Sequence, residues 1–112
     1  MGHERREHPR IKCNDTRFSG AFRLPDGTIR EFRLVGRNVS RGGVSFMSDR
    51  TATEGSRIDV VLPTREGEMI GVSGQVRSCR NVGFVLHEIG VQFEDPLDET
   101  SFGELAIVPQ RP

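Results

Sequence analysis

Apolar and polar residues alternate along most of this chain, in short runs that are separated by turn residues. In Thr28–Val39, Phe32 and Leu34 fall on one side of an extended strand and Arg33 falls on the other. The Asp26-Gly27 pair before this run is a strong hairpin signal. Six runs are predicted as strands: Thr16–Arg23, Thr28–Val39, Val44–Ser48, Ile58–Leu62, Met69–Arg80 and Val82–Phe93. Turn signals at this spacing favour an all-β domain, either an antiparallel barrel or a sandwich, of about six strands.

One helix is predicted after the last strand. Asp95 is a suitable N-cap and Pro96 suits the first helical position, while the acidic residues that follow complement the helix dipole. A rough apolar stripe on this helix would cover one mouth of a barrel: Leu97, Phe102, Leu105 and Ala106.

The length of 112 residues corresponds to one small domain. Residues 1–12, MGHERREHPRIK, are charged and are interrupted by Pro9, so we expect a flexible arm ahead of a domain at 13–110. No run of 18 apolar residues occurs, which excludes a membrane-spanning helix. The charged start lacks the apolar segment of a secretory signal, so the cytoplasm is the expected location.

Sequence signatures of enzymes and metal sites are missing from the chain. It has no GxSxG, Walker loop, GxGxxG or HExxH motif. Its two cysteines, Cys13 and Cys79, show no CxxC spacing, and its three histidines lie far from any nucleophile–base set. We therefore expect no enzyme activity, no metal and no cofactor.

The first candidate motif is an arginine cluster in the arm. Arg5, Arg6 and Arg10 form an RRxxxR pattern with Pro9 inside it, in a chain that has 15 arginines and one lysine. The planar guanidinium group pairs bidentately with phosphate and stacks on flat rings, whereas the ammonium group of lysine does neither. The excess of arginine also agrees with a GC-rich coding bias, and the motif alone also fits a solvated charged tail.

The second candidate motif is Asn38-Val39-Ser40-Arg41-Gly42-Gly43, which fits [DN]xSxxG at a junction between two predicted strands. Asn38 and Ser40 share a face because strand side chains alternate. Gly43 leaves the backbone bare, so a ligand can approach it closely. The alternative is a local turn, in which Asn38 and Ser40 only satisfy nearby backbone groups.

Together and in this order, the two motifs resemble a stand-alone PilZ domain, a bacterial receptor for the second messenger cyclic di-GMP. The resemblance extends over nearly the whole chain and includes Gly42–Phe46, the strand with Val72, Gly74 and Val76, and the closing Ile89–Phe93. It implies a six-stranded antiparallel split β-barrel with one short C-terminal helix.

The resemblance also implies roles for individual residues. Arg6 and Arg10 would bind phosphate and guanine, and Arg5 would hold a stacked ligand dimer. Asn38 and Ser40 would hydrogen-bond a guanine edge, and Gly43 would leave room for the ring. Further candidates lie beside the motif or on strands that border the same face: Arg41, Arg37, Gly42, Arg77 and Arg33. Many relatives have Asp at the position of Asn38, and an amide accepts fewer guanine donors than a carboxylate does.

On this hypothesis the arm becomes ordered over cyclic di-GMP and presents a new surface to a partner protein, without any chemical reaction. One alternative is a PilZ-like adaptor that acts through protein contacts alone. Another is a barrel that binds single-stranded nucleic acid, which the zero net charge and the lack of Trp and Tyr disfavour. The sequence does not determine the pathway, the ligand stoichiometry or the oligomeric state.

Overall fold

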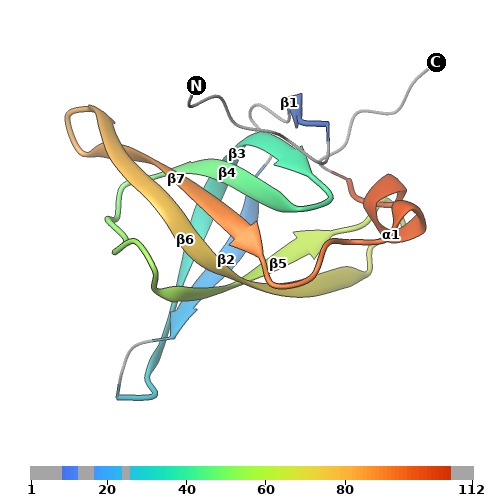
Figure 1. Ribbon diagram of the computed structural model, residues 1–112, viewed down its shortest axis with the longest axis horizontal. Coiled ribbons are helices and arrows are strands. Elements are labelled where there is room, and N and C mark those ends of the chain that lie inside the picture. Colours follow the sequence, from blue (N-terminus) through green and yellow to red (C-terminus); the bar gives the residue numbers. More distant parts are fainter. Residues whose placement is uncertain (1–8, 13–16, 24–25, 107–112) are drawn as a thin grey trace, which may run out of the picture.

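The structure is a computed structural model and describes residues 9–12, 17–23 and 26–106, apart from the side chains of Arg23 and Phe32. Three features of the sequence analysis therefore lie outside the described residues: Cys13, the predicted start of the first strand at Thr16, and the expected core position of the Phe32 side chain. The described strands and helix follow one another along the chain (Figure 1): β1 (Ile11–Lys12), β2 (Arg17–Arg23), β3 (Ile29–Ser40), β4 (Gly43–Ser48), β5 (Arg57–Pro63), β6 (Met69–Gly83), β7 (Leu86–Phe93) and α1 (Glu99–Gly103).

Strands β2 to β7 close into an antiparallel barrel. Their order is β3-β2-β5-β6-β7-β4, and the additional pairing of β3 with β4 joins the two ends of the sheet. Asn38 and Val39 pair with β1 on one side and with β4 on the other, so β1 continues along the edge of β3 that β2 also uses. The prediction of a mainly-β, six-stranded antiparallel barrel is confirmed, and β1 is a short addition to it.

The barrel interior is filled by the inward-facing residues of every barrel strand. Alternation is clearest in β5, where Ile58, Val60 and Leu62 are fully buried and their neighbours are not. Phe18 and Phe46 meet edge to face, with ring centroids 6.0 Å apart. The buried apolar residues form one cluster: Phe18, Leu34, Val39, Val44, Phe46, Ile58, Val60, Leu62, Val72, Val76, Ile89, Val91, Phe93 and Leu105.

Glycines on either side of β7 allow the barrel to close tightly. A Cβ atom at Gly43 of β4 would lie less than 3.0 Å from the Val91 carbonyl oxygen. A Cβ atom at Gly74 of β6 would lie equally close to the Gln92 carbonyl oxygen. The backbones of β4 and β6 therefore approach β7 more closely than any side chain would allow.

The helix begins later than the sequence predicts. Its N-cap is Asp98, whose Oδ1 accepts a hydrogen bond from the Ser101 backbone N–H at 2.6 Å, and this bond lowers the pKa of the Asp98 carboxyl. The predicted cap Asp95 and first position Pro96 are wrong. The backbone N–H and C=O of the next residue, Leu97, both form hydrogen bonds with Arg41. They are therefore not available for helical hydrogen bonds at that point.

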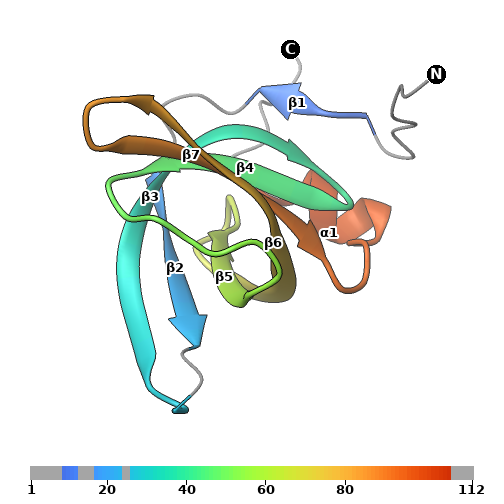
Figure 2. The same cartoon turned by 60° about the vertical axis from the view of Figure 1, so that its left-hand side comes forward.

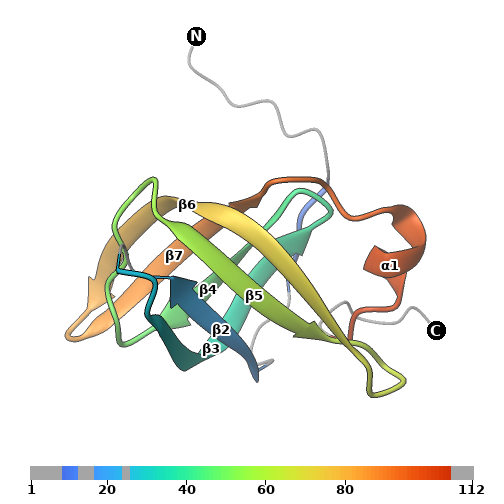
Figure 3. The ribbon, with the colours of Figure 1, turned by 90° about the horizontal axis from the view of Figure 1, so that it is seen from below.

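The C-terminal segment covers one mouth of the barrel. Leu105 is fully buried, and Leu97 and Phe102 pack against the core, whereas Ala106 is exposed. The predicted helical stripe is wrong, because Phe102 alone of these four residues lies within α1. Leu105 also pairs with Thr64 at the β5–β6 turn, beside which α1 lies (Figure 3). Within the described residues, no helix has the length and hydrophobicity that crossing a membrane requires.

Strand β6 is longer than predicted and forms a projecting hairpin with β7. The predicted break near Asn81 is wrong: β6 continues to Gly83, and Phe84 and Val85 form the turn. The Asn81 side-chain amide donates to the carbonyl oxygens of Phe84 (2.7 Å) and Leu86 (3.2 Å) and so holds this turn together. The hairpin projects on the side of the molecule opposite α1 (Figures 1 and 2).

Candidate functional site

A bulge in β3 brings Asn38 and Ser40 to the outer face of the barrel. Leu34 and Val39 are both buried in the core, although strict alternation would place residues five positions apart on opposite faces. The pairing with β4 shifts at this point and leaves Arg37 outside the ladder. The extra residue reverses the two faces, so Asn38 and Ser40 lie outward and half-buried. The odd spacing of Leu34 and Val39 is the sequence signal for this bulge.

Two rows of small and polar residues cross this outer face from strand to strand. The first row runs through β1, β3, β4, β7 and β6: Lys12, Asn38, Ser45, Gly90 and Ser78. The second runs through β3, β4, β7 and β6: Ser40, Gly43, Gln92 and Gln75. Beyond Asn38 the first row has no large side chain, and within it Ser45 is only 7% exposed whereas Ser78 is exposed.

The polar side chains of the motif make contacts within the β3–β4 hairpin. Asn38 Nδ2 donates to Ser45 Oγ at 3.3 Å. Ser40 Oγ accepts from the Gly42 backbone N–H at 3.2 Å and donates to the Gly43 carbonyl at 3.5 Å. Ser40 therefore makes the contacts of a local turn, as the alternative interpretation of this motif expects.

Arg41 joins the β3–β4 turn to the segment that precedes α1. Its Nε donates to the Leu97 carbonyl at 2.6 Å, and its carbonyl accepts from the Leu97 N–H at 2.8 Å. An exposed ion pair links Arg41 to Glu99 of α1 at 4.0 Å. The neighbouring Gly42 carbonyl accepts from the Phe93 N–H at 2.8 Å. Both residues, which the sequence suggests as ligand contacts, hold the barrel and its C-terminal segment together.

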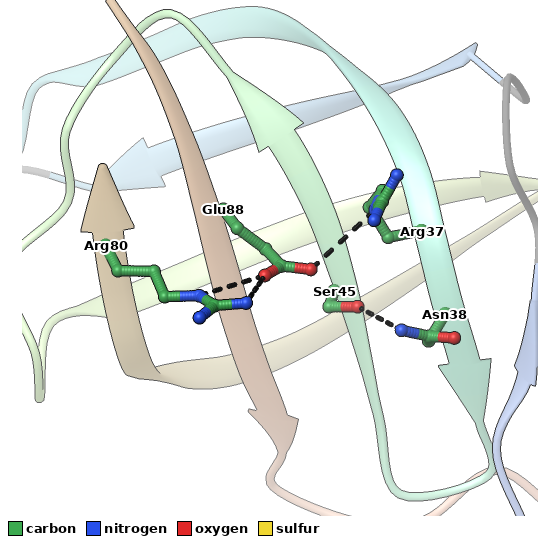
Figure 4. A network of polar contacts seen from close by, with 5 residues as sticks. All are labelled: Arg37, Asn38, Ser45, Arg80 and Glu88. Atoms are coloured by element: carbon green, nitrogen blue, oxygen red, sulfur yellow. Dashed lines mark hydrogen bonds and ion pairs between the residues drawn. The ribbon is translucent and has the colours of Figure 1, made fainter. Parts of the chain in front are cut away.

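An ion-pair network lies beside the first row (Figure 4). Glu88 on β7 lies between Arg80 of β6, at 2.7 Å, and Arg37 of the bulge, at 3.8 Å. The Glu88 side chain is only 18% exposed, whereas those of Arg37 and Arg80 are 50% and 73% exposed. Sequence reasoning missed Arg80, because only the β6–β7 register brings it opposite Glu88.

The start of the described chain lies next to the motif. Ile11 pairs with Val39 and Lys12 pairs with Asn38, which brings β1 beside the end of β3 (Figure 2). Arg10 directly precedes this pairing and is exposed. Arg5 and Arg6 lie outside the described residues. Lys12 was not among the sequence candidates, although it directly follows the arginine motif.

Of the other candidates, Arg77 lies on β6 between Gln75 of the second row and Ser78 of the first row. Arg77 is exposed at a bulge in β6, and Arg33 is exposed and lines a groove that contains Met47. The glycine at position 43 is explained by the close approach of the Val91 carbonyl. Among the described residues no three of the His, Cys, Asp and Glu side chains are grouped so that they could hold a metal ion.

Comparison with solved structures finds the same fold in several proteins. Bacillus subtilis inhibitor of motility MotI/DgrA matches with a TM-score of 0.65 and 15% identity, over 92% of this chain and 49% of that one. The PilZ domain of YcgR from Escherichia coli, solved with c-di-GMP, matches with a TM-score of 0.56 and 19% identity, over 81% and 79% of the two chains. The MrkH–c-di-GMP complex of K. pneumonia matches with a TM-score of 0.60 and 17% identity, over 82% and 45%.

The chain thus spans about half the length of MotI/DgrA and MrkH. Comparison with curated protein sequences gives no significant match. A sequence profile of the PilZ domain matches residues 4–107, which is nearly the whole chain and includes both motifs. The protein belongs to the PilZ domain family.

Proposed function

We propose that this protein is a cytoplasmic receptor for cyclic di-GMP that binds the nucleotide between its N-terminal arm and the outer face of β3, β4 and β7. The observation that carries the proposal is the pairing of β1 with Asn38 and Val39, because it brings the residue after Arg10 to the edge of the serine–glycine rows. Two PilZ proteins of the same fold, YcgR and MrkH, have been solved with c-di-GMP, which supports the choice of ligand.

The N-terminal arm and the outer face of the barrel carry groups that suit the phosphates and the guanines of this ligand. Cyclic di-GMP carries two phosphates and two guanines, and guanidinium groups recognise both phosphate oxygens and the guanine O6/N7 edge. In the proposal Arg6 and Arg10 supply these groups, and Arg5 holds a second, stacked nucleotide. Asn38 and Ser40 bond the guanine edge, and the purine lies over the small residues of the first row. Arg37, Arg41, Gly42 and Arg77 are secondary candidates.

Signalling follows from the cost of ordering the arm. Fixing each backbone residue costs about 1–2 kcal/mol, and in the proposal charge-assisted contacts with the nucleotide offset this cost for the part of the arm that precedes β1. The ordered arm and the bound nucleotide then form a surface that a partner protein can recognise, and no bond in the ligand is broken. The domain on this proposal is a switch and not an enzyme.

Isothermal titration of the folded protein with cyclic di-GMP tests the proposal. Binding in the micromolar range or tighter is expected, with GMP and cyclic di-AMP as nucleotide controls that bind far more weakly. A folded protein that shows no binding heat at about 50 µM ligand would count against the receptor function.

Replacing Asn38 by Asp is expected to tighten binding about tenfold. A carboxylate accepts hydrogen bonds from both guanine N1–H and N2–H₂, whereas the amide accepts with one oxygen only. The matched control is Asn81→Asp at the distant β6–β7 turn, which makes the same chemical change and should leave the affinity as it is. An unchanged or weaker affinity for Asn38→Asp would contradict the assigned contact with guanine.

A nucleotide-independent adaptor is the second candidate function. Ser40 bonds its own turn and Arg41 bonds Leu97, so two of the motif side chains already have partners within the protein. On this alternative the motif is a structural device that fastens the C-terminal segment, and the titration described above shows no binding by the wild-type protein.

A further inference from the structure

The tip of the β6–β7 hairpin exposes a cluster of apolar side chains. Phe84 is fully exposed, and Val85, Leu86 and Val82 are 65%, 45% and 44% exposed. Two other large apolar side chains among the described residues are exposed, Ile29 and Met69. Both lie on other hairpins. An apolar cluster at the end of a projecting hairpin marks a surface for association.

The residues at this tip are poorly suited to the turn itself. Phe84 has a positive φ of 45°, a conformation that costs a bulky residue about 1–2 kcal/mol. Two-residue hairpin turns such as the one formed by Phe84 and Val85 favour Asn-Gly or Asp-Gly at these positions. Phe84 and Val85 are thus unfavourable turn residues that expose apolar surface. This indicates that their side chains serve a contact with another molecule and not the turn itself.

A groove that fits such a tip lies on the same side of the molecule. Its volume is about 410 Å³, and Val35, Met47 and Leu86 form its apolar lining. Pockets of about 300–1,000 Å³ hold whole small molecules, so an aromatic ring and a neighbouring side chain fit inside. Leu86 belongs to both the tip and the groove, which makes the two features direct neighbours.

We propose that the β6–β7 tip of one copy inserts Phe84 into this groove of a second copy, and that the reciprocal contact forms around a two-fold axis. An isologous interface requires that each subunit supplies both the projecting tip and the groove that receives the partner's tip. The two features lie next to each other on one surface of this protein and so meet that requirement. The contact uses no residue of the proposed nucleotide motifs, so it stands or fails independently of that function.

Charge favours a second copy over a lipid surface. The groove is lined by residues of both signs, with Arg33 and Arg50 as well as Glu31 and Asp49, and the chain has a formal net charge of zero. Copies of a protein without net charge are not kept apart by long-range repulsion. Apolar hairpins or helices that bind membranes are typically surrounded by an excess of basic residues.

Sedimentation equilibrium of the full chain from about 5 to 500 µM tests the proposal. We expect the average mass to rise from the monomer value of 12.5 kDa towards twice that value. Phe84→Asn removes the ring and supplies a residue that tolerates the left-handed conformation. It should therefore abolish association while thermal stability stays equal or increases. Met47→Arg fills the groove and should also give a monomer.

Mixing the two variants gives the decisive result. Phe84→Asn keeps an intact groove and Met47→Arg keeps an intact tip, so an equimolar mixture forms one of the two contacts and regains part of the association. Met69→Ser, which removes a large apolar side chain that is 55% exposed on another hairpin, is the control and should behave like the wild type. A monomer at every concentration would overturn the proposal, even if the tip then bound lipid vesicles or another protein. So would a mixture that stays monomeric.

Discussion

Replacing Arg6 and Arg10 together by alanine is expected to weaken cyclic di-GMP binding by at least about a hundredfold. Each guanidinium group that pairs with a phosphate or a guanine edge contributes about 1.5–3 kcal/mol, so the loss of two amounts to about 3–6 kcal/mol. Isothermal titration gives the two affinities, and circular dichroism verifies that the double variant is folded.

Two further variants separate this effect from a general loss of positive charge. Arg30→Ala removes an exposed arginine at the opposite end of β3 and should leave the affinity unchanged. Replacing Arg6 and Arg10 by lysine keeps both charges but loses the planar fork, so it should recover only part of the affinity. If Arg30→Ala weakened binding as much as the double variant, the arginine motif would have no specific role.

Replacing Gly43 by alanine is expected to destabilise the unliganded protein by about 2–4 kcal/mol, and to lower Tm by about 10 °C or more. The new Cβ atom would lie less than 3.0 Å from the Val91 carbonyl oxygen, so the backbones of β4 and β7 would have to separate. Chemical denaturation gives the free energy of unfolding, and a thermal scan gives Tm, both without ligand.

Gly71→Ala provides the comparison for this effect. Gly71 lies in β6 with no atom within 4 Å of an added Cβ and without a positive φ, so its replacement should leave stability nearly unchanged or slightly higher. A Gly43→Ala protein as stable as the wild type would show that the barrel tolerates a side chain there. The glycine would then have to be explained by the ligand alone.

The barrel was predictable because it depends on local alternation. Runs such as Phe32-Arg33-Leu34, in which apolar and charged residues alternate, and short apolar runs such as Ile58–Leu62 identify a strand without any knowledge of its neighbours. The end of β6 was not predictable in this way. Its last residues continue past Arg80 because Asn81 bonds across the turn to Phe84 and Leu86, a contact that depends on the three-dimensional arrangement of the hairpin.

The helix start shows a similar limit. Asp95 and Asp98 are both good caps followed by acidic residues, and sequence alone gives no reason to prefer the second. The preference comes from Leu97, whose backbone groups bond Arg41, a residue 56 positions earlier in the chain. Contacts of such long range cannot be read from a local pattern.

The candidate site was predictable in its residue types but only partly in their roles. The motif correctly locates Asn38 and Ser40 on an outer face, although the bulge at Arg37 is what puts them there. The expected role of Arg41 as a ligand contact competes with the bond to Leu97, and the row of small residues next to Asn38 depends on the register of four strands.

The closure of the barrel also bears on how this protein avoids aggregation. Each of the strands β2 to β7 has a hydrogen-bonded neighbour on both sides over part of its length, although β4 pairs with β3 only from Val35 onward and β5 pairs with β6 only up to Gln75. Beside the barrel, β1 is two residues long, too short to template a growing fibril. Addition of a further strand is therefore restricted to the remaining parts of β3 and β6, because most of the barrel backbone is already paired.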